Sequence, residues 1–218
     1  MLSFFLKKRK SEGAYLWLEP WRELRRSGSA WRPVAGALVF QGIREGVFSF
    51  LIGLLVYIAA QTESKLGQFA LITSSVSLVS YYAAGKWFKP RLRSAGMLAG
   101  GILLVAVIVP LLWKLSYGTL LLMGIGTSLF IPLYMLPMTS ISFDLMGETA
   151  ESASKRVEWV VLRELSLMSG RLLGILVFIG VLSVSGTTQV IIVLLLALGT
   201  APLGSWLVLR RREAGDMS

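Results

Sequence analysis

Charged and polar side chains interrupt a long apolar stretch near the start of this sequence, and these side chains could bind a polar solute or form an ion pair. Five of its positions follow the spacing of a single helix stripe: Gln41, Arg44, Glu45, Phe48 and Ile52. A carboxylate next to a guanidinium on such a stripe could line the path of a polar solute. The same two groups could instead form an ion pair that locks two helices together, and the sequence leaves both interpretations open.

A later apolar stretch also carries charges. Arg163 and Glu164 lie near its start, whereas Arg171 lies about eleven residues inside it. A charge near the centre of a bilayer is unfavourable by about 2.5–3.5 kcal/mol on insertion scales, so Arg171 requires a polar partner or a wet cavity. Gly170 and Gly174 form a small-xxx-small pair that permits close helix approach. The pattern favours a cavity or helix-gating role for Arg171 over packing alone.

Two prolines, Pro132 and Pro137, fall inside a third apolar stretch, on either side of Tyr134. Each proline removes a backbone donor and frees a carbonyl, so we expect a bend or a local opening of the helix there. Such interruptions often mark gating or binding positions in transporters, which makes Tyr134 and Pro137 candidate residues of a substrate path. Proline is also frequent in membrane helices generally, which is the structural alternative.

The composition excludes several kinds of chemistry. The chain has no cysteine and no histidine, so it lacks thiolate nucleophiles and the usual zinc ligands. It also has no P-loop motif. We therefore expect no catalytic residue, no cofactor and no metal site, and we do not expect an enzyme. The net charge of +10 comes from clusters between apolar runs, which does not favour a nucleic-acid partner.

The elements that carry these residues are predicted to be transmembrane helices. Hydrophobic residues make up 55% of the 218 positions and the mean hydropathy is +0.69, which is too apolar for a soluble domain. A bilayer core of about 30 Å requires about 20 helical residues. Six stretches qualify: 34–60, 66–85, 94–113, 115–143, 157–182 and 190–209. The predicted fold is an all-α bundle of six transmembrane helices, with the third and sixth facing lipid because they are apolar all round.

Basic residues indicate which side of the membrane each loop faces. They precede the first predicted helix, recur in every second loop and follow the last helix, whereas the alternate loops contain only Lys65 and Lys114. The clustered residues are Lys7, Lys8, Arg9, Lys10, Arg22, Arg25, Arg26, Arg32, Lys86, Lys89, Arg91, Arg93, Lys155, Arg156, Arg210, Arg211 and Arg212. Because positive charges favour the cytoplasmic side, the pattern predicts a multi-pass protein of the bacterial inner membrane with both termini in the cytoplasm.

This topology divides the chain into three parts. Residues 33–212 form the six-helix domain, and residues 213–218 form a cytoplasmic tail. Residues 1–32 precede the domain and contain aromatic residues between basic ones, namely Tyr15, Trp17, Trp21 and Trp31. This mixture is typical of a segment at the level of the lipid headgroups, and a cytoplasmic linker is the alternative.

Several local sequences resemble the C-terminal six-helix half of a major facilitator superfamily transporter. Residues 35–46 are similar to the start of the seventh helix in bacterial members. Residues 85–93 resemble the basic loop motif of the family, although the Asp and the second Gly of that motif are absent. Arg163-Glu164 followed by Gly170-Arg171 is similar to the eleventh helix. The resemblance extends over roughly residues 10 to 212 and identifies no substrate.

The resemblance implies an arrangement and a function. In that family, the first and fourth helices of a half line a central cavity, the second and fifth contact the other half, and the third and sixth face lipid. We therefore expect a secondary-transporter half that moves a small solute by alternating access. Its expected partners are membrane lipid and either a missing N-terminal half or a second copy of the chain. A fragment, a split-gene half and a homodimeric half-transporter all remain open, as does a non-transporting membrane scaffold or an inactive transporter fragment.

Overall fold

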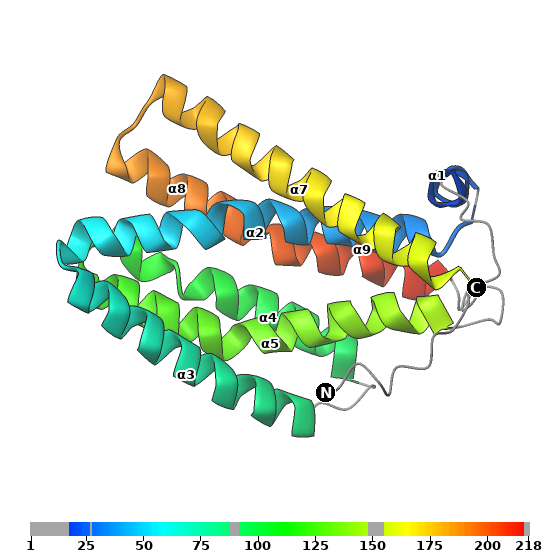
Figure 1. The fold of residues 1–218 in the computed structure, drawn as a ribbon, viewed down its shortest axis with the longest axis horizontal. Coiled ribbons are helices and arrows are strands. Elements are labelled where there is room, and N and C mark those ends of the chain that lie inside the picture. Colours follow the sequence, from blue (N-terminus) through cyan, green and yellow to red (C-terminus); the bar gives the residue numbers. More distant parts are fainter. Residues whose placement is uncertain (1–17, 27, 88–91, 148–154, 216–218) are drawn as a thin grey trace, which may run out of the picture.

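A computed structural model describes residues 18–26, 28–87, 92–147 and 155–215, and every regular element within these ranges is a helix. In chain order the elements are α1 (Glu19–Arg25), α2 (Trp31–Ala60), α3 (Glu63–Trp87), α4 (Arg93–Ala106), the 3-10 helix η3 (Val109–Leu112), α5 (Tyr117–Gly147), α7 (Arg156–Val184), α8 (Thr188–Gly199) and α9 (Ala201–Gly215). Figure 1 shows the long helices gathered into one bundle. The expected all-α fold is therefore confirmed for the described part of the chain.

Five helical stretches are long and apolar enough to cross a membrane, which indicates a membrane location. They are Trp31–Ala60, Arg93–Leu112, Tyr117–Gly147, Arg156–Val184 and Thr188–Arg210, and each corresponds to one of the predicted helices. The remaining predicted helix is α3, whose 25 residues span about 37 Å. α3 is therefore long enough to cross a membrane. It is not among the five apolar stretches, because its several serines lower its mean hydropathy.

Two of the predicted helices are interrupted next to a proline. α4 ends at Ala106, and the 3-10 helix η3 that follows has Pro110 in its first turn. α8 ends at Gly199, and α9 begins one residue before Pro202. Proline cannot donate a backbone hydrogen bond and its ring crowds the preceding turn, so a continuous α-helix ends before it.

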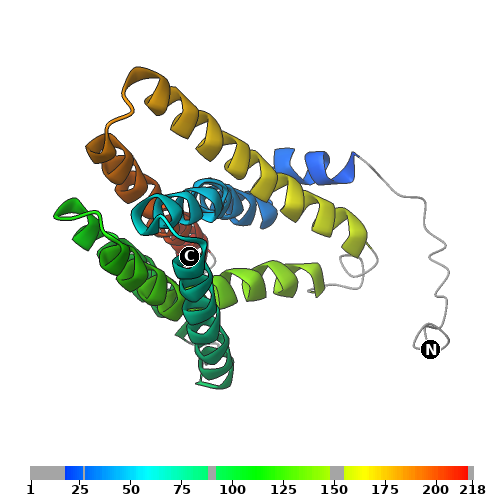
Figure 2. The same ribbon diagram turned by 60° about the vertical axis from the view of Figure 1, so that its left-hand side comes forward.

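The helix α5 behaves differently, because it contains two prolines and is nevertheless continuous. Pro132 and Pro137 both lie inside its 31 residues. Figure 2 shows that α5 changes direction near its middle, which agrees with the expected bend. The expected alternative, a local opening of the helix, is not seen.

The helix α2 lies at the centre of the bundle. It packs most extensively against α7, then against α9, and it also contacts α5 and α3. α5 packs on α4 and α3, and α4 packs on α9. α7 and α5 have little contact with each other, and Figures 1 and 2 show them diverging on one side of the bundle. α2 therefore contacts both α5 and α7, and these two helices leave one side of α2 uncovered between them.

The last apolar stretch packs on protein over part of its surface. The sequence predicts that this stretch faces lipid, and 44% of its apolar window is buried, the largest share among the five. The reason is that α9 packs on both α2 and α4. The corresponding share for α7, which carries several charges, is 17%. Hydrophobicity alone does not distinguish a helix that packs on protein from one that packs on lipid.

The apolar core consists of two clusters at different levels of α2. One cluster surrounds the first turns of α2 and includes Tyr134, and the other surrounds its second half and includes Leu195. Between these two levels α2 carries three polar residues: Gln41, Arg44 and Glu45. The polar part of the stripe predicted from the sequence therefore lies between two apolar layers, and Phe48 belongs to the second of them.

Among the aromatic residues of the segment 1–32, Trp31 is buried. Its side chain is 4% exposed, and its ring stacks on that of Trp159 with the centroids 5.2 Å apart. The Trp31 ring therefore packs on α7, and α2 begins two residues before the predicted domain boundary. Trp21 in α1 is exposed, as a headgroup position requires. The first 17 residues, with Tyr15 and Trp17, lie outside the described part.

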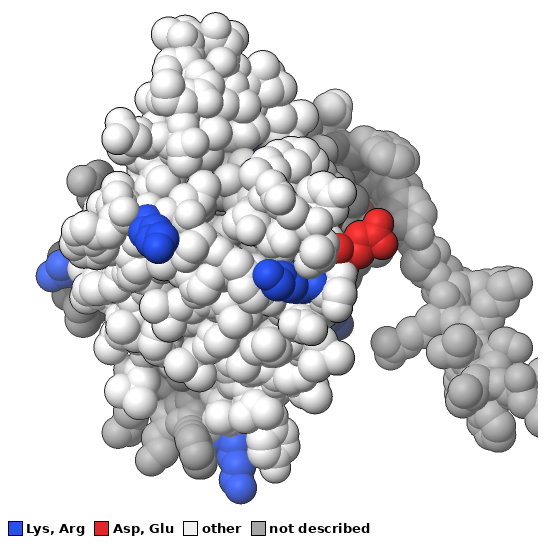
Figure 3. All heavy atoms as spheres, turned by 90° about the vertical axis from the view of Figure 1, so that its left-hand side faces the viewer, with Lys and Arg blue, Asp and Glu red and all other residues white. Residues whose placement is uncertain are grey.

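The two ends of the bundle differ in charge. Figure 1 shows that α2, α4 and α7 begin, and α3, α5 and α9 end, on the same side. Described residues of the basic clusters lie near these helix ends: Arg32, Lys86, Arg93, Arg156 and Arg210. Lys89 and Arg91 lie outside the described residues. The opposite end, shown in Figure 3, is mostly uncharged and carries only a few separate charged side chains.

Candidate functional site

The helices α2 and α7 approach so closely that glycines on each touch the backbone of the other. Gly42 and Gly46 on α2 face Gly170 and Gly174 on α7. At each of the four positions, a Cβ atom would clash with a backbone atom of the opposite helix. A Cβ on Gly46, for example, would lie 2.8 Å from the carbonyl oxygen of Arg171. The contact therefore depends on two small-xxx-small pairs that meet each other.

One of these glycine pairs is predicted from the sequence, and the other is not. The sequence singles out Gly170 and Gly174 because small residues four positions apart permit close helix approach. Gly42 and Gly46 have the same four-residue spacing and flank Glu45. Two small-xxx-small pairs, each next to a charge of opposite sign, are a signal that could have predicted the pairing of these helices.

An ion pair joins the two helices beside the glycine contact. The Nη2 of Arg171 donates a hydrogen bond to Oε2 of Glu45 over 2.9 Å. The Nε2 of Gln41 donates to the other carboxylate oxygen over 2.7 Å, so both oxygens of Glu45 have a partner. The expectation that Arg171 reaches a polar group on another helix is confirmed. The side chains of Arg171 and Glu45 are 35% and 22% exposed, so the pair lies at the edge of the protein interior.

Arg44 stands next to this ion pair but does not take part in it. The residue is 5% exposed, and among the described residues neither its Nε nor its Nη2 has a hydrogen-bond partner. Its guanidinium carbon lies 4.6 Å from the centroid of the Phe48 ring, a favourable cation–π contact that leaves those N–H groups unused. A buried, unpaired cation is strongly unfavourable, so its presence calls for a functional explanation.

A cavity of about 590 Å³ adjoins these charges. Its lining comes from three helices: Arg44, Glu45, Phe48, Ser49 and Ile52 of α2, Thr127, Ile131 and Met135 of α5, and Arg171 of α7. The hydroxyl oxygen of Thr127 is buried and has no hydrogen-bond partner among the described residues. This volume falls within the range of about 300–1,000 Å³ that is usual for small-molecule sites. The cavity thus combines a small-molecule volume with unused polar groups.

The α5 side of this cavity was missed at the sequence level. Thr127, Ile131 and Met135 repeat every four residues, so they lie on one face of the helix. The Sδ of Met135 also accepts a hydrogen bond of 3.2 Å from Gln41. Because apolar residues are spread around all sides of α5, this face has no compositional contrast that would reveal it.

The structure places Tyr134 in the core and not at the cavity. Its hydroxyl shares a hydrogen bond of 2.9 Å with the hydroxyl of Ser205, and either oxygen can be the donor. The Ser205 hydroxyl lies 2.9 Å from the carbonyl oxygen of Ala37, to which it can donate. Tyr134 therefore belongs to a buried polar link between α2, α5 and α9.

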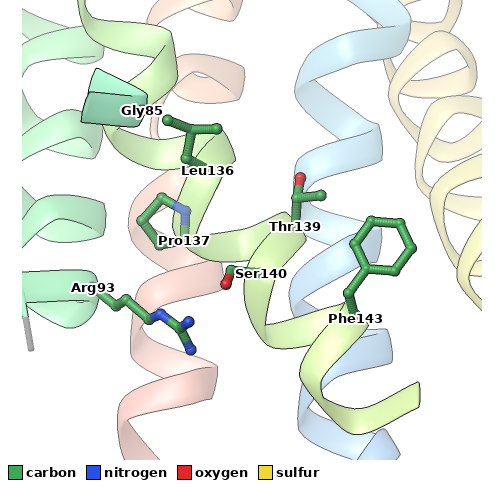
Figure 4. Close-up of a pocket in the computed structure, with 7 residues that line it drawn as sticks. All are labelled: Gly85, Arg93, Leu136, Pro137, Thr139, Ser140 and Phe143. Carbon is green, nitrogen blue, oxygen red and sulfur yellow. The ribbon is translucent and has the colours of Figure 1, made fainter. Parts of the chain in front are cut away.

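Pro137 lies at a second, separate cavity of about 380 Å³. Figure 4 shows its lining residues: Gly85, Arg93, Leu136, Pro137, Thr139, Ser140 and Phe143. Arg93, at the start of α4, also forms an ion pair with Asp144 of α5. This cavity lies toward the basic end of the bundle, because both members of the ion pair are close to helix ends on that side.

The last two candidates, Arg163 and Glu164, pair with each other on α7. The guanidinium carbon of Arg163 also lies 6.0 Å from the ring centroid of Phe143, a residue of the second cavity. Neither residue lines the larger cavity. The eight candidates therefore separate into one group of four around the 590 Å³ cavity and four that lie elsewhere.

No protein-family model and no solved structure matches this chain. The chain is similar to the uncharacterized protein YqgE of Bacillus subtilis (strain 168), with 37% identity over 179 residues. The alignment covers 82% of this chain and 41% of that relative, so the chain spans less than half of the relative's length. The description of the relative names no activity.

Proposed function

We propose that this chain is a six-helix half of a secondary transporter of the major facilitator type, and that the cavity between α2, α5 and α7 is its share of the solute path. One observation carries the proposal: a cavity between apolar helices is lined by an ion pair and by the buried, unpartnered Arg44. Ionisable groups inside a membrane bundle generally face a water-filled cavity or a substrate pathway. Transport of a small solute gives these residues a function.

The helices that line the cavity support the transporter assignment. α2 and α5 correspond to the first and fourth predicted helices, which line the central cavity in the family that the sequence resembles. We assign α3 as the sixth membrane span, because its length is sufficient and it returns the chain to the basic end of the bundle. With six spans, both termini lie on the basic side, which we place in the cytoplasm of a bacterial cell.

A second half would complete the path. α5 and α7 have little contact, and α7 has the smallest buried share of the five apolar stretches. The relative YqgE extends well beyond the aligned 41% of its length, which leaves room for a second set of helices. We propose that a second half, in the same polypeptide, in another chain or in a second copy, closes the cavity by rocking against this one.

A non-transporting scaffold is the second candidate, and one feature favours it. The closest helix contact and the Glu45–Arg171 ion pair join the same two helices, α2 and α7. Both features could serve helix assembly alone, as the ion-pair interpretation of the sequence allows. A scaffold, however, gives no function to the unused donors of Arg44 and Thr127.

Water accessibility distinguishes the two candidates. Because the chain has no cysteine, single cysteines can be introduced without prior substitutions. In native membrane vesicles we expect Ser49→Cys and Ile52→Cys to react with a membrane-impermeant maleimide, because both residues line the cavity. Ile102→Cys on the exposed face of α4, the third predicted helix, is the control and should not react, because lipid excludes the reagent. Unreactive cysteines at both cavity positions would favour the scaffold.

Transport itself is measured in vesicles that contain the assembled chain and its partner. A panel of labelled small solutes should include at least one that accumulates, and Arg171→Leu should reduce its accumulation because the ion pair at the cavity edge is lost. Normal assembly without accumulation of any solute, together with dry cavity positions, would replace the transporter by the scaffold.

A further inference from the structure

We infer that the cavity binds a small organic anion, whose carboxylate, phosphate or sulfonate group is held by Arg44. The inference rests on the proposed function, because it specifies the class of solute that the transport path accepts. It is drawn from three features of the cavity: the balance of its charges, the donors that remain unused, and the apolar remainder of its wall.

The charges that line the cavity do not balance. Arg44 and Arg171 contribute two positive charges, and Glu45 is the one carboxylate among the described lining residues. Glu45 is hydrogen-bonded to Arg171 and Gln41, and neither Nε nor Nη2 of Arg44 forms a hydrogen bond to it. The excess positive charge therefore resides on Arg44. A solute with one negative charge would neutralise it and remove the unfavourable burial of an unpaired cation.

The unused donors match the geometry of an anionic group. Nε and Nη2 are adjacent nitrogens of one guanidinium, and this fork binds two oxygens of a carboxylate or phosphate at once. The hydroxyl of Thr127, on the opposite wall, is a third donor without a partner. At present Arg44 lies against Phe48. A rotation of the guanidinium away from that ring would direct the N–H groups into the cavity.

The rest of the cavity wall is apolar and favours a solute with an apolar portion. Phe48, Ile52, Ile131 and Met135 line the cavity beside the charged group. An apolar portion of a solute would replace water against these side chains, which is favourable. An inorganic ion would leave most of the volume without a matching contact. The site therefore fits an organic anion with an aromatic or aliphatic body.

Binding can be measured as thermal stabilisation of the purified full chain in neutral detergent at constant ionic strength. The probes are benzoate, phenyl phosphate and benzenesulfonate, and the controls of similar size are neutral benzyl alcohol and cationic benzyltrimethylammonium. We expect a saturable rise in the unfolding temperature with at least one anion. The apparent affinity of the controls should be weaker by about tenfold or more, because they cannot accept a charge-assisted hydrogen bond from Arg44. Equal stabilisation by the neutral control would overturn the inference.

Two arginine variants locate the effect. Arg44→Gln should lose the response to anions, whereas Arg93→Gln removes the same charge at the second cavity and should keep it. Thr127→Val should weaken the response by a smaller factor, because it removes one donor and leaves the charge. If Arg44→Gln folds and still responds as the parent chain does, the anion binds elsewhere and the assignment is wrong.

Lipid headgroups carry the same anionic chemistry, so a second arm separates the two sources. The chain is placed in nanodiscs of phosphatidylcholine with or without phosphatidylglycerol, and the soluble anions are then added. We expect the soluble anions to stabilise the chain in both lipid mixtures. Stabilisation by phosphatidylglycerol that depends on Arg44, with no response to soluble anions, would show a lipid site and overturn the assignment to a solute.

The outcome for binding is independent of the outcome for transport. Anion binding that depends on Arg44, without accumulation of any solute, would keep this inference and remove the transporter. Accumulation of neutral or cationic solutes alone would keep the transporter and overturn this inference.

Discussion

Arg171 and Glu45 are 126 positions apart in the sequence, yet a hydrogen bond of 2.9 Å joins Nη2 of one to Oε2 of the other. The bond crosses the closest helix contact of the bundle, between α7 and α2. The carboxylate of Glu45 also interacts electrostatically with a second cation, Arg44. The stability of this region should therefore respond differently to the loss of each charge.

We predict that Glu45→Gln destabilises the chain more than Arg171→Gln does. Loss of Glu45 leaves two cations without a counter-charge, whereas loss of Arg171 leaves the carboxylate free to turn toward Arg44. The expected losses in unfolding free energy are about 2 kcal/mol and about 1 kcal/mol, reduced from fully buried values because both side chains are partly exposed. Denaturation in mixed micelles measures both, and the reverse order would show that Arg44 does not sense Glu45.

The Arg93–Asp144 pair offers a matched control for this experiment. Its side chains are 29% and 59% exposed, so solvent screens the pair more strongly. Asp144→Asn should change the unfolding free energy by about 0–1 kcal/mol. A loss as large as that for Glu45→Gln would indicate that the charge change itself, and not its position, decides the effect.

The glycine contact between α2 and α7 gives a second prediction. Gly42→Ala and Gly170→Ala should each reduce the unfolding free energy by about 1–3 kcal/mol, because the new methyl group meets backbone atoms that cannot move aside. Gly53→Ala and Gly180→Ala lie in the same two helices but have no neighbouring atom within 4 Å of an added Cβ. These two controls should be neutral or stabilising by up to about 1 kcal/mol, since alanine is the better helix former. Equal effects at all four sites would mean that α2 and α7 are not in backbone contact.

The sequence predicted the helices and the polar stripe of α2 because both depend on local patterns. Arg44 and Glu45 are conspicuous in an apolar run, and helical spacing places them on one face. The sequence does not identify the partner of Glu45, because any of the three arginines in the two charged stretches, Arg44, Arg163 and Arg171, could neutralise it. Arg171 takes that role, and the single excess positive charge falls on Arg44.

Other features depend on packing between distant segments, which composition does not encode. The face of α5 that lines the cavity, beginning with Thr127, is as apolar as its other faces, so no pattern sets it apart. Tyr134 and Pro137 are only three positions apart, yet one is enclosed in the core and the other lines the second cavity. Trp31 could not be separated from Trp21 by sequence, because only the stacking partner Trp159 decides which ring is buried.

A third prediction concerns the unpartnered cation itself. Arg44→Leu should raise the unfolding free energy of the unliganded chain by about 1–3 kcal/mol, because it replaces an unsatisfied buried charge by an apolar side chain. The lost cation–π contact with Phe48 offsets only about 1 kcal/mol or less of this gain. Thermal unfolding without added anion measures the effect. A clear loss of stability would show that Arg44 has a structural partner, and would weaken its assignment as a ligand for solutes.

The final prediction concerns the topology, and above all α3, which is not among the five apolar stretches. We expect reporters after Arg212 and at Lys89 to report the cytoplasm, and a reporter at Gly186 to report the outside. A reporter at Lys65 tests α3 directly, because Lys65 and Lys89 lie on opposite sides of the membrane only if α3 crosses it. Lys89 and Arg212 lie where the structure describes no side chain, but a reporter requires only their place in the sequence. Alkaline phosphatase and green fluorescent protein fusions give the two readouts.

With five spans instead of six, these results would change in a defined way. If α3 lay along the membrane surface, Lys65 and Lys89 would report the same side, and the two chain ends would lie on opposite sides. The basic clusters near Arg93 and Arg156 would then face the outside, against the tendency of positive charges to remain in the cytoplasm. Six alternating spans place every cluster on one side, as Figure 1 shows for their helix ends. We therefore expect Lys65 to report the outside, together with Gly186, because only then do all the basic clusters stay in the cytoplasm.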